Sequence, residues 1–178
     1  MSLMKKNSIL EYLRELNSGL ADIGKHGEMF MIGGAVLTLV YNVRDATRDV
    51  DCRFKPRKEI LDIAATIAKK HNLNNDWISD DIEPFITPQM TFSEFMRFSN
   101  LIVHSIDDEP MLALKLSSAR PAPSRDLSDS VYFMKRLKIE SVDEAMDIVE
   151  KYVRPELIVP LVRHFAVEVF EKYQLETR

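Results

Sequence analysis

A glycine pair that interrupts an apolar run, followed by two closely spaced aspartates, constrains this chain more than any other feature. The apolar residues 29–32 precede Gly33 and Gly34, and Asp49 and Asp51 come shortly afterwards. Beyond the glycines, apolar residues recur at helical spacing, which is typical of a helix with one buried face. The sequence therefore predicts a strand, a tight turn, a helix, and then a second strand that carries the two acids.

The glycine pair has two interpretations. Glycine has no Cβ atom, so Gly33 and Gly34 let a ligand approach the backbone, and the N–H groups at the start of a helix attract phosphate. The alternative is an ordinary turn between a strand and a helix. The acids that follow favour a phosphate-binding turn, because a metal ion held by them can bridge phosphate oxygens.

The two aspartates are predicted to share one face of their strand. Side chains alternate along a strand, so Asp49 and Asp51 converge, while Val50, Cys52 and Phe54 form the opposite, apolar face. Paired carboxylates suit Mg²⁺, which prefers oxygen ligands and retains several water molecules. The alternative is an exposed strand edge whose acids are solvated.

Two motifs together carry a resemblance to a known family. They contain the residues Arg44, Thr47, Asp49 and Asp51 behind the glycine pair, and later the segments Leu112–Leu116 and Arg125–Asp129. Over residues 28–137 the chain resembles the nucleotidyltransferase fold of the DNA-polymerase-β-like superfamily. It is most similar to small bacterial nucleotidyltransferases, which include uncharacterised families and the AbiE-type abortive-infection toxins.

The resemblance implies a nucleotide site with a divalent metal ion. Gly33 and Gly34 would hold the phosphates of a nucleoside triphosphate (NTP), and Asp49 and Asp51 would ligate Mg²⁺ or Mn²⁺. Lys115 would contact phosphate. The resemblance thus makes Asp49, Asp51 and Lys115 the catalytic residues of a transfer of a nucleoside monophosphate to a hydroxyl acceptor, with release of pyrophosphate.

Four further residues receive nucleotide-site roles from the resemblance. Arg44 and Thr47 would hold the loop that leads into the acidic strand, and Asp126 and Asp129 would position Lys115 or an acceptor. The residues around Lys115 single it out independently, because its helix is apolar on nearly every side. Buried lysines usually have a partner. Lys115 is therefore predicted either to contact phosphate or to pair with Asp126 or Asp129, and both can hold at once.

The sequence offers no evident third carboxylate, although many members of the superfamily carry one on a neighbouring strand. The candidate strand Asn100–Ile106 contains His104 and Ser105 instead, and Glu94 lies on the strand expected before it. His104 is interpreted as a structural histidine rather than a base. The group that would activate an acceptor is consequently unassigned.

Composition sets broad bounds on the class of protein. A chain of 178 residues with 46% hydrophobic content suffices for one substantial core with a helical appendage. A net charge of -4 gives no global signature of nucleic-acid binding, yet 24 basic residues leave room for a local patch. The single Cys52 allows no internal disulfide, and no secretion signal is recognisable, so we expect a cytoplasmic protein. No membrane span is expected, because the longest apolar-rich run, Met29–Tyr41, is shorter than the roughly 20 residues required.

Hydrophobic patterning predicts an α+β fold in two portions. Residues 1–107 are expected to form a nucleotidyltransferase-like mixed sheet with flanking helices, and residues 108–178 a helical portion that packs on this core and completes the cleft. The local signals are capping boxes at Ser8–Glu11 and Ser141–Glu144, a helix beginning at Pro56, an irregular segment with a short helix over 72–89, and a hairpin that turns at Ser99–Asn100.

Three hypotheses on function follow. The first is a Mg²⁺-dependent nucleotidyltransferase acting on RNA, protein or a small molecule, in the manner of a toxin-type enzyme. The second is a nucleotide-binding protein without catalysis, suggested by the missing third acid. The third is a binding-only half of a two-component system with an antitoxin-like partner protein, in which the acids are structural.

Overall fold

The chain divides into two compact units, which are described separately. The computed structural model describes residues 3–118 and 125–177. One unit, the sheet unit, comprises Met1–Pro84 and Phe92–Ile106, and the other, the helical unit, comprises Phe85–Thr91 and Asp107–Arg178. The fold is mixed α/β, with a five-stranded mixed sheet and flanking helices.

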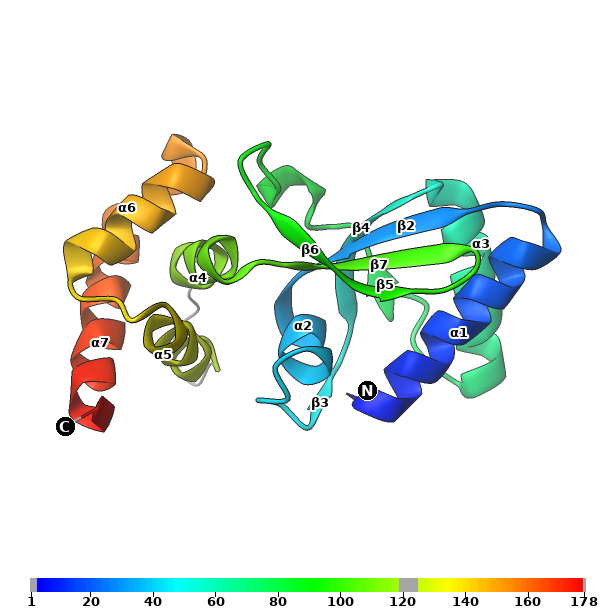
Figure 1. The fold of residues 1–178 in the computed structure, drawn as a ribbon, viewed down its shortest axis with the longest axis horizontal. Coiled ribbons are helices and arrows are strands. Elements are labelled where there is room, and N and C mark those ends of the chain that lie inside the picture. Colours follow the sequence, from blue (N-terminus) through cyan, green and yellow to red (C-terminus); the bar gives the residue numbers. More distant parts are fainter. Residues whose placement is uncertain (1–2, 119–124, 178) are drawn as a thin grey trace. The chain divides into compact units, whose positions relative to one another are not determined.

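The sheet unit is built around strands in the spatial order β5-β4-β2-β7-β6 (Figure 1). Its helices are α1 (Lys6–Asp22), α2 (Gly33–Leu39) and α3 (Arg57–His71), and its sheet strands are β2 (Gly27–Met31), β4 (Val50–Lys55), β5 (Ile78–Ser79), β6 (Phe92–Arg97) and β7 (Leu101–Ile106). Strand β2 pairs antiparallel with β4 and parallel with β7. Two short strands, β1 (Met4–Lys5) and β3 (Ala46–Thr47), pair separately.

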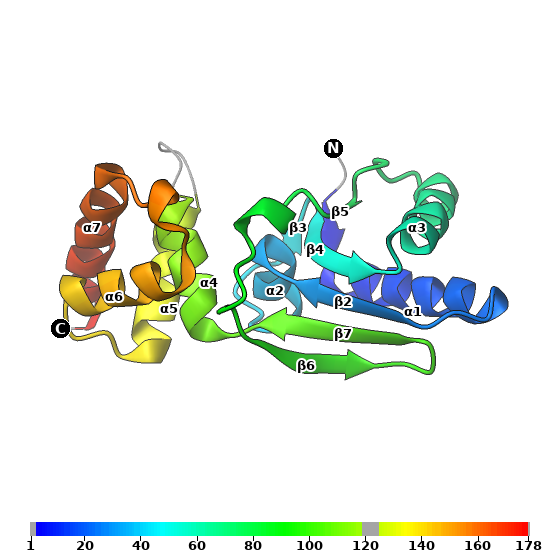
Figure 2. The ribbon, with the colours of Figure 1, turned by 90° about the horizontal axis from the view of Figure 1, so that it is seen from above.

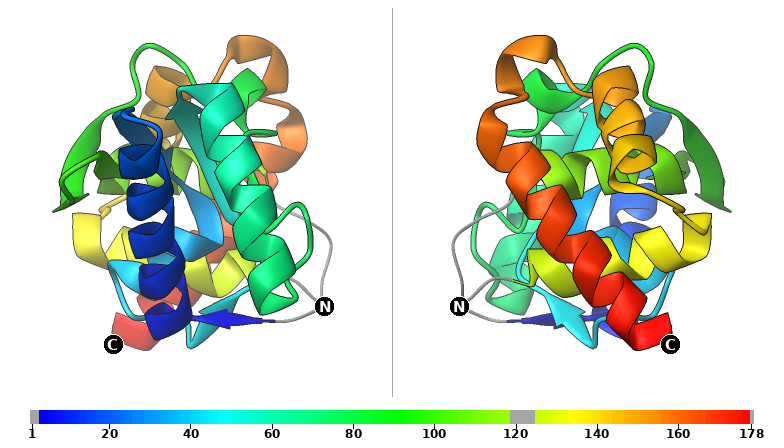
Figure 3. Two further views of the ribbon diagram at one scale, coloured as in Figure 1. Left: turned by 90° about the vertical axis from the view of Figure 1, so that its right-hand side faces the viewer. Right: turned by 90° about the vertical axis from the view of Figure 1, so that its left-hand side faces the viewer.

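Helices α1 and α3 cover one face of this sheet and enclose its core (Figure 3). Their close approach is visible at Gly27, where an added Cβ atom would lie 2.7 Å from Leu20 of α1, 3.3 Å from Leu101 of β7 and 3.4 Å from Ile60 of α3. The indole of Trp77 is also buried and donates a hydrogen bond to the carbonyl of Ala64 at 3.0 Å. These contacts fix both helices on the sheet.

The opposite face of the sheet carries half-buried aromatic and charged side chains. Phe30 and His104 are register partners on β2 and β7, and their rings stack with centroids 4.6 Å apart. His104 Nε2 lies 2.9 Å from Glu28 Oε1, and Lys55 Nζ lies 2.8 Å from Glu28 Oε2. His104 is thus engaged by a carboxylate, which agrees with its interpretation as a structural histidine.

Several local predictions can be compared directly with the structure. The hairpin is confirmed, because Phe98 N donates to Leu101 O at 2.8 Å. The cap at Ser141 is also confirmed, since its hydroxyl accepts from Glu144 N at 3.1 Å. The capping box at Ser8 is wrong: α1 begins earlier, at Lys6, and has no side-chain cap. A segment of 17 residues that packs on a sheet can begin without one, because burial of its apolar face provides most of the stability.

The segment over 72–89, predicted to be irregular with a short helix, contains one more regular element. It forms the 3-10 turn Glu83–Phe85, and it also contributes β5, which pairs parallel with β4. A strand of two residues carries no periodic signal. It is formed through its pairing partner, which the local sequence does not reveal.

The helical unit consists of four α-helices within its described residues (Figure 2). They are α4 (Asp108–Ser117), α5 (Asp126–Leu137), α6 (Val142–Tyr152) and α7 (Pro160–Thr177), with a 3-10 turn at Pro155–Leu157. Helix α4 packs against α5 and α6, and its Leu112 and Leu116 are completely buried. Thr87 joins this unit by donating to the Tyr152 carbonyl at 2.9 Å. Within the described ranges, no helix is both long and apolar enough to cross a membrane.

Candidate functional site

The glycine pair lies where β2 gives way to α2, as the sequence predicts, and its two residues are the first of α2. Gly33 adopts a left-handed backbone conformation with φ +68°, which favours glycine. The turn is tied to the acidic strand, because Ile32 N donates to Asp51 O at 3.0 Å. A Cβ atom on Gly33 would lie 3.0 Å from Asp51 Oδ2. The Asp51 carboxylate therefore lies directly against the glycine backbone.

Gly34 is equally confined, but by the loop before the acids. A Cβ atom there would lie only 2.5 Å from Thr47 Oγ1 and 3.3 Å from Arg44 Nη1. Thr47 is buried in β3, and its hydroxyl donates to the Asp49 carbonyl at 3.2 Å. The side chains of Arg44 and Thr47 thus reach the glycine turn, and Thr47 in addition fixes the backbone at the first acid.

Burial alternates along the acidic segment in the predicted manner. Asp51 belongs to β4 and Asp49 comes just before it, and both are half-buried, whereas Val50 and Cys52 are fully buried on the helix-covered face. Burial raises the pKa of the Cys52 thiol well above its ordinary value, and the negative charges of Asp51 and Asp80 raise it further. The thiol is consequently an inert core group.

The two aspartates offer a donor set that fits Mg²⁺ or Mn²⁺ only in part. Carboxylate oxygens are suitable ligands, and such ions commonly complete their coordination with water and substrate phosphate. Within residues 3–118 and 125–177, neither Asp49 nor Asp51 belongs to a group of three metal-ligating side chains whose donor atoms lie within 4.8 Å of one another. The two aspartates alone are therefore the assigned protein ligands in the described part of the chain.

Lys115 and its two predicted partners come together in the helical unit. Lys115 Nζ lies 2.8 Å from Asp129 Oδ2 and 3.5 Å from Asp126 Oδ1. The lysine and Asp129 side chains are 12% and 6% exposed, so this ion pair is nearly excluded from water. The pairing left open by the sequence is therefore present. The predicted site residues form two groups: Gly33, Gly34, Arg44, Thr47, Asp49 and Asp51 in the sheet unit, and Lys115, Asp126 and Asp129 in the helical unit.

Sequence reasoning missed a third group of polar side chains, Glu11, Glu15 and His71. Their potential ligand atoms all lie within 4.8 Å of one another. The only sequence signal is the spacing of the two glutamates, which places them on one helical face. The histidine joins them through the packing of α1 on α3, which the sequence does not specify. Elsewhere in this unit, Asp80 pairs with Arg57, whose Nη2 lies 3.1 Å from its Oδ1.

Comparisons with known proteins found no related protein. No family model matches the chain, no curated protein matches it significantly, and no solved structure does so either. The resemblance to nucleotidyltransferases thus remains a prediction from the sequence motifs.

Proposed function

We propose that the protein is a metal-dependent nucleotidyltransferase that moves a nucleoside monophosphate from an NTP to a hydroxyl acceptor. The observation that carries the proposal is the closeness of the glycine turn to Asp51 of β4. Asp51 Oδ2 would lie 3.0 Å from a Cβ atom on Gly33. A carboxylate and a glycine backbone are thereby adjacent. A triphosphate bound with a divalent ion requires both kinds of group.

In this proposal different residues of the sheet unit bind the metal ion and the phosphates. Asp49 and Asp51 hold Mg²⁺ or Mn²⁺, and the backbone at Gly33 and Gly34 accommodates the phosphates. When bound, the metal ion supplies positive charge to the phosphate oxygens. The acceptor hydroxyl oxygen forms a bond to the α-phosphorus, the bond from that phosphorus to the β-bridging oxygen breaks, and pyrophosphate leaves while the hydroxyl proton passes to solvent.

Lys115 enters the proposal as a phosphate contact, on the basis of the family resemblance. Its ion pairs with Asp126 and Asp129 support a positioning role for the two aspartates, because they fix the ammonium group of a long, flexible side chain. The Lys115 side chain as a whole is 12% exposed. The acceptor class is RNA, protein or a small molecule, and a toxin-type enzyme with an antitoxin-like partner remains part of the proposal by analogy.

One observation favours a second candidate function, a nucleotide-binding protein without catalysis. The described structure places no third metal-ligating side chain in a group with Asp49 and Asp51. Such a protein would bind NTP and metal saturably and release no pyrophosphate. For both candidates we propose the cytoplasm, a location supported by the single cysteine, which is free and buried.

The first experiment measures thermal stabilisation by each of the four NTPs with and without Mg²⁺. A ligand that binds only the folded state raises the midpoint of unfolding. We expect a metal-dependent rise for at least one NTP with the parent protein, and its loss in the double variant Asp49→Ala/Asp51→Ala. Asp81→Asn is the matched control, because Asp81 is an exposed acid of the same unit.

The results separate the hypotheses cleanly. A metal-dependent rise that persists in the double variant would refute the assigned site, and no rise with any NTP would refute nucleotide binding altogether. Where binding is found, release of pyrophosphate in the presence of candidate acceptors distinguishes the transferase from the protein without catalysis. Loss of turnover in Asp51→Ala with an unchanged folded state is the expected signature of the transferase.

A further inference from the structure

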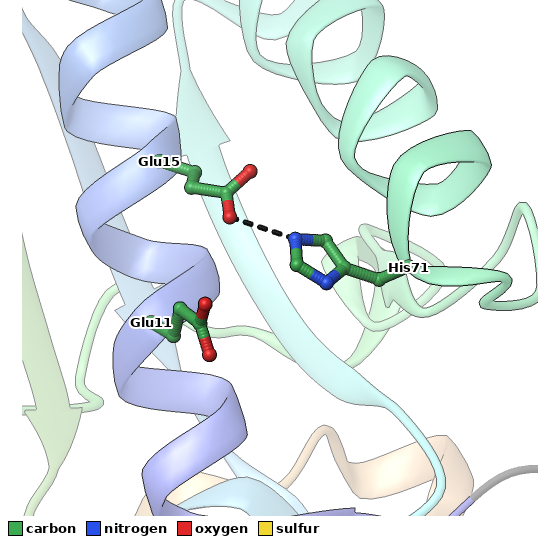
Figure 4. A group of neighbouring side chains, drawn as sticks. All are labelled: Glu11, Glu15 and His71. Carbon is green, nitrogen blue, oxygen red and sulfur yellow. Dashed lines mark hydrogen bonds and ion pairs between the residues drawn. The ribbon is translucent and has the colours of Figure 1, made fainter.

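A second cluster of potential metal ligands lies on the helix-covered side of the sheet unit, apart from the glycine turn. Glu11 and Glu15 project from α1, and His71 projects toward them from the last turn of α3 (Figure 4). Within the described part of the chain, these three are the only histidine, cysteine or acidic residues that form such a group, with donor atoms all within 4.8 Å of one another. Two carboxylates and an imidazole are thus available at one point.

The fold fixes the position of these side chains from both helices. Residues four apart share a helical face, which aligns Glu11 with Glu15. The helices are in close contact, since an added Cβ atom on Gly19 of α1 would lie 2.7 Å from Ile63 of α3. The imidazole of His71 packs on the ring of Tyr12, with centroids 4.8 Å apart. The histidine is therefore oriented by packing as well as by its polar partner.

Two of the three ligands already face each other at hydrogen-bond distance. His71 Nε2 lies 2.7 Å from Glu15 Oε1, and Lys70 Nζ lies 3.0 Å from the same oxygen. Burial by itself raises the pKa of the Glu15 carboxyl, but the hydrogen bonds from Lys70 and His71 outweigh it and lower the pKa. The Glu15 carboxylate and the His71 imidazole are thus already in contact.

We propose that Glu11, Glu15 and His71 form a binding site for a divalent transition metal, Zn²⁺ in the first place. The ion would lie between Glu15 Oε1 and His71 Nε2 in place of their hydrogen bond, and the proton of that bond would pass to solvent. Mixed imidazole and carboxylate donors suit zinc, whereas Mg²⁺ prefers oxygen ligands alone. Three protein ligands leave a fourth position for water.

The required adjustments are small and fall on exposed groups. Donor atoms on one tetrahedral zinc ion stand roughly 3.3 Å apart at bond lengths of about 2.0 Å. Glu11 is exposed and can swing inward, and the ammonium group of Lys70, with a side chain that is 62% exposed, can turn into solvent. A bound ion would then join α1 to α3 and stabilise the sheet unit, independently of any nucleotide.

The test compares the midpoint of thermal unfolding in ZnCl₂ and in MgCl₂, using the full chain without an affinity tag. We expect a saturable rise with zinc and none with magnesium at the same concentration. Glu11→Gln and His71→Gln should each weaken zinc binding at least about tenfold, since even the loss of a group behind a ligand has that effect. Glu11→Gln is the safer variant for folding, because Glu11 is exposed.

Matched controls separate this site from scattered surface binding. His26→Gln removes an exposed histidine of the same unit, and Glu171→Gln removes an exposed glutamate of α7, so both should bind zinc like the parent. Asp49→Ala/Asp51→Ala should also retain the zinc effect, which distinguishes this site from the proposed nucleotide site. Co²⁺ provides a second readout, because four-coordinate cobalt absorbs visible light strongly, and this absorption should be lost in His71→Gln.

Two results would overturn the proposal. One is the absence of any saturable zinc effect on the parent protein. The other is an equal effect in the parent, Glu11→Gln and His71→Gln. In either case the three side chains form an ion-pair network between α1 and α3 and no metal site.

Discussion

The glycine turn of the sheet unit and the lysine cluster of the helical unit hold their acids by different physical means. In the turn, Asp51 is half-buried, and its position is set by the backbone, through the Ile32 N–H bond to its carbonyl and the contact with Gly33. In the cluster, Asp129 is 6% exposed and lies 2.8 Å from the Lys115 ammonium. Backbone contacts contribute to the first arrangement, and a nearly buried ion pair contributes to the second.

This difference teaches where each site is vulnerable. A methyl group added to Gly33 would press on the Asp51 carboxylate, because its Cβ atom would lie 3.0 Å from Asp51 Oδ2. An acid held by a buried cation is sensitive to loss of that cation, because an uncompensated charge away from water is costly. The turn should therefore be sensitive to the size of the residues at its glycines, and the cluster to loss of the lysine charge.

The largest effect is expected for Lys115→Met, which preserves the apolar stem and removes the charge. It leaves the carboxylates of Asp126 and Asp129 without the ammonium group, and we expect a loss of about 3 kcal/mol in the free energy of unfolding. Urea denaturation measures this loss. Lys172→Met, at an exposed position, is the control and should change little. An unchanged midpoint in Lys115→Met would show that the cluster is not held by charge.

The sequence could predict the local structure around the glycine pair and the acids because its signals are local. The glycine pair, the alternation of acids with Val50 and Cys52, and the hairpin turn at Ser99–Asn100 depend on a few adjacent residues each, and the structure agrees with all three. Pairing of Lys115 with Asp126 or Asp129 was predictable for a similar reason, since an isolated lysine in an apolar helix needs a partner. The sequence could not choose between this pair and a phosphate contact.

The remainder was not predictable because it depends on contacts distant in sequence. Strand β5 exists only through its pairing with β4, and the approach of His71 to Glu15 depends on the packing of α3 on α1. The Ser8 prediction failed for another reason. Its capping pattern is real in the sequence, but the helix extends past it to Lys6, and a polar pattern inside a helix has no capping role.

The second largest loss in the free energy of unfolding is expected at Gly34, where an alanine would place its Cβ 2.5 Å from Thr47 Oγ1. Overpacking of this kind costs typically 1–3 kcal/mol, and we expect about 2 kcal/mol for Gly34→Ala by urea denaturation. The double variant Gly34→Ala/Thr47→Ala removes the obstructing hydroxyl. Its loss should therefore be smaller than the sum of the two single losses. Strict additivity would contradict the steric account of the turn.

A somewhat smaller effect is expected for Gly33→Ala, and the chain contains a matched control for it. Gly33 and Gly24 have similar positive φ angles, +68° and +64°, but nothing lies within 4 Å of a Cβ atom on Gly24. Each alanine incurs the left-handed strain of about 1–2 kcal/mol. Gly33→Ala should lower the free energy of unfolding more than Gly24→Ala does, because the added methyl group also presses on Asp51. Only Gly33→Ala should disturb NTP binding. Equal losses, measured by urea denaturation, would mean that the Asp51 contact adds nothing.

The smallest effect is expected at Glu28, a carboxylate that is held by charge like Asp129 but is more exposed. The hydrogen bond from Lys55 is the main factor that lowers the pKa of Glu28, His104 lowers it further, and burial opposes both. A lowered pKa stabilises the folded state above the unfolded-state pKa, and this contribution disappears as the pH falls through the folded-state value. Because the Glu28 and Lys55 side chains are 28% and 72% exposed, solvent limits the contribution to less than about 1 kcal/mol.

The measurement that isolates this contribution compares the parent with Glu28→Gln in urea at pH 7 and at pH 3. At pH 7 the parent should be slightly more stable, since only its carboxylate attracts Lys55. At pH 3 the difference should shrink, because protonation makes the parent resemble the variant. High salt should also reduce the difference at pH 7, as screening weakens exposed ion pairs. A difference that is independent of both pH and salt would mean that Glu28 stabilises the fold by packing. Glu28 would then differ from Asp129, which pairs with a lysine.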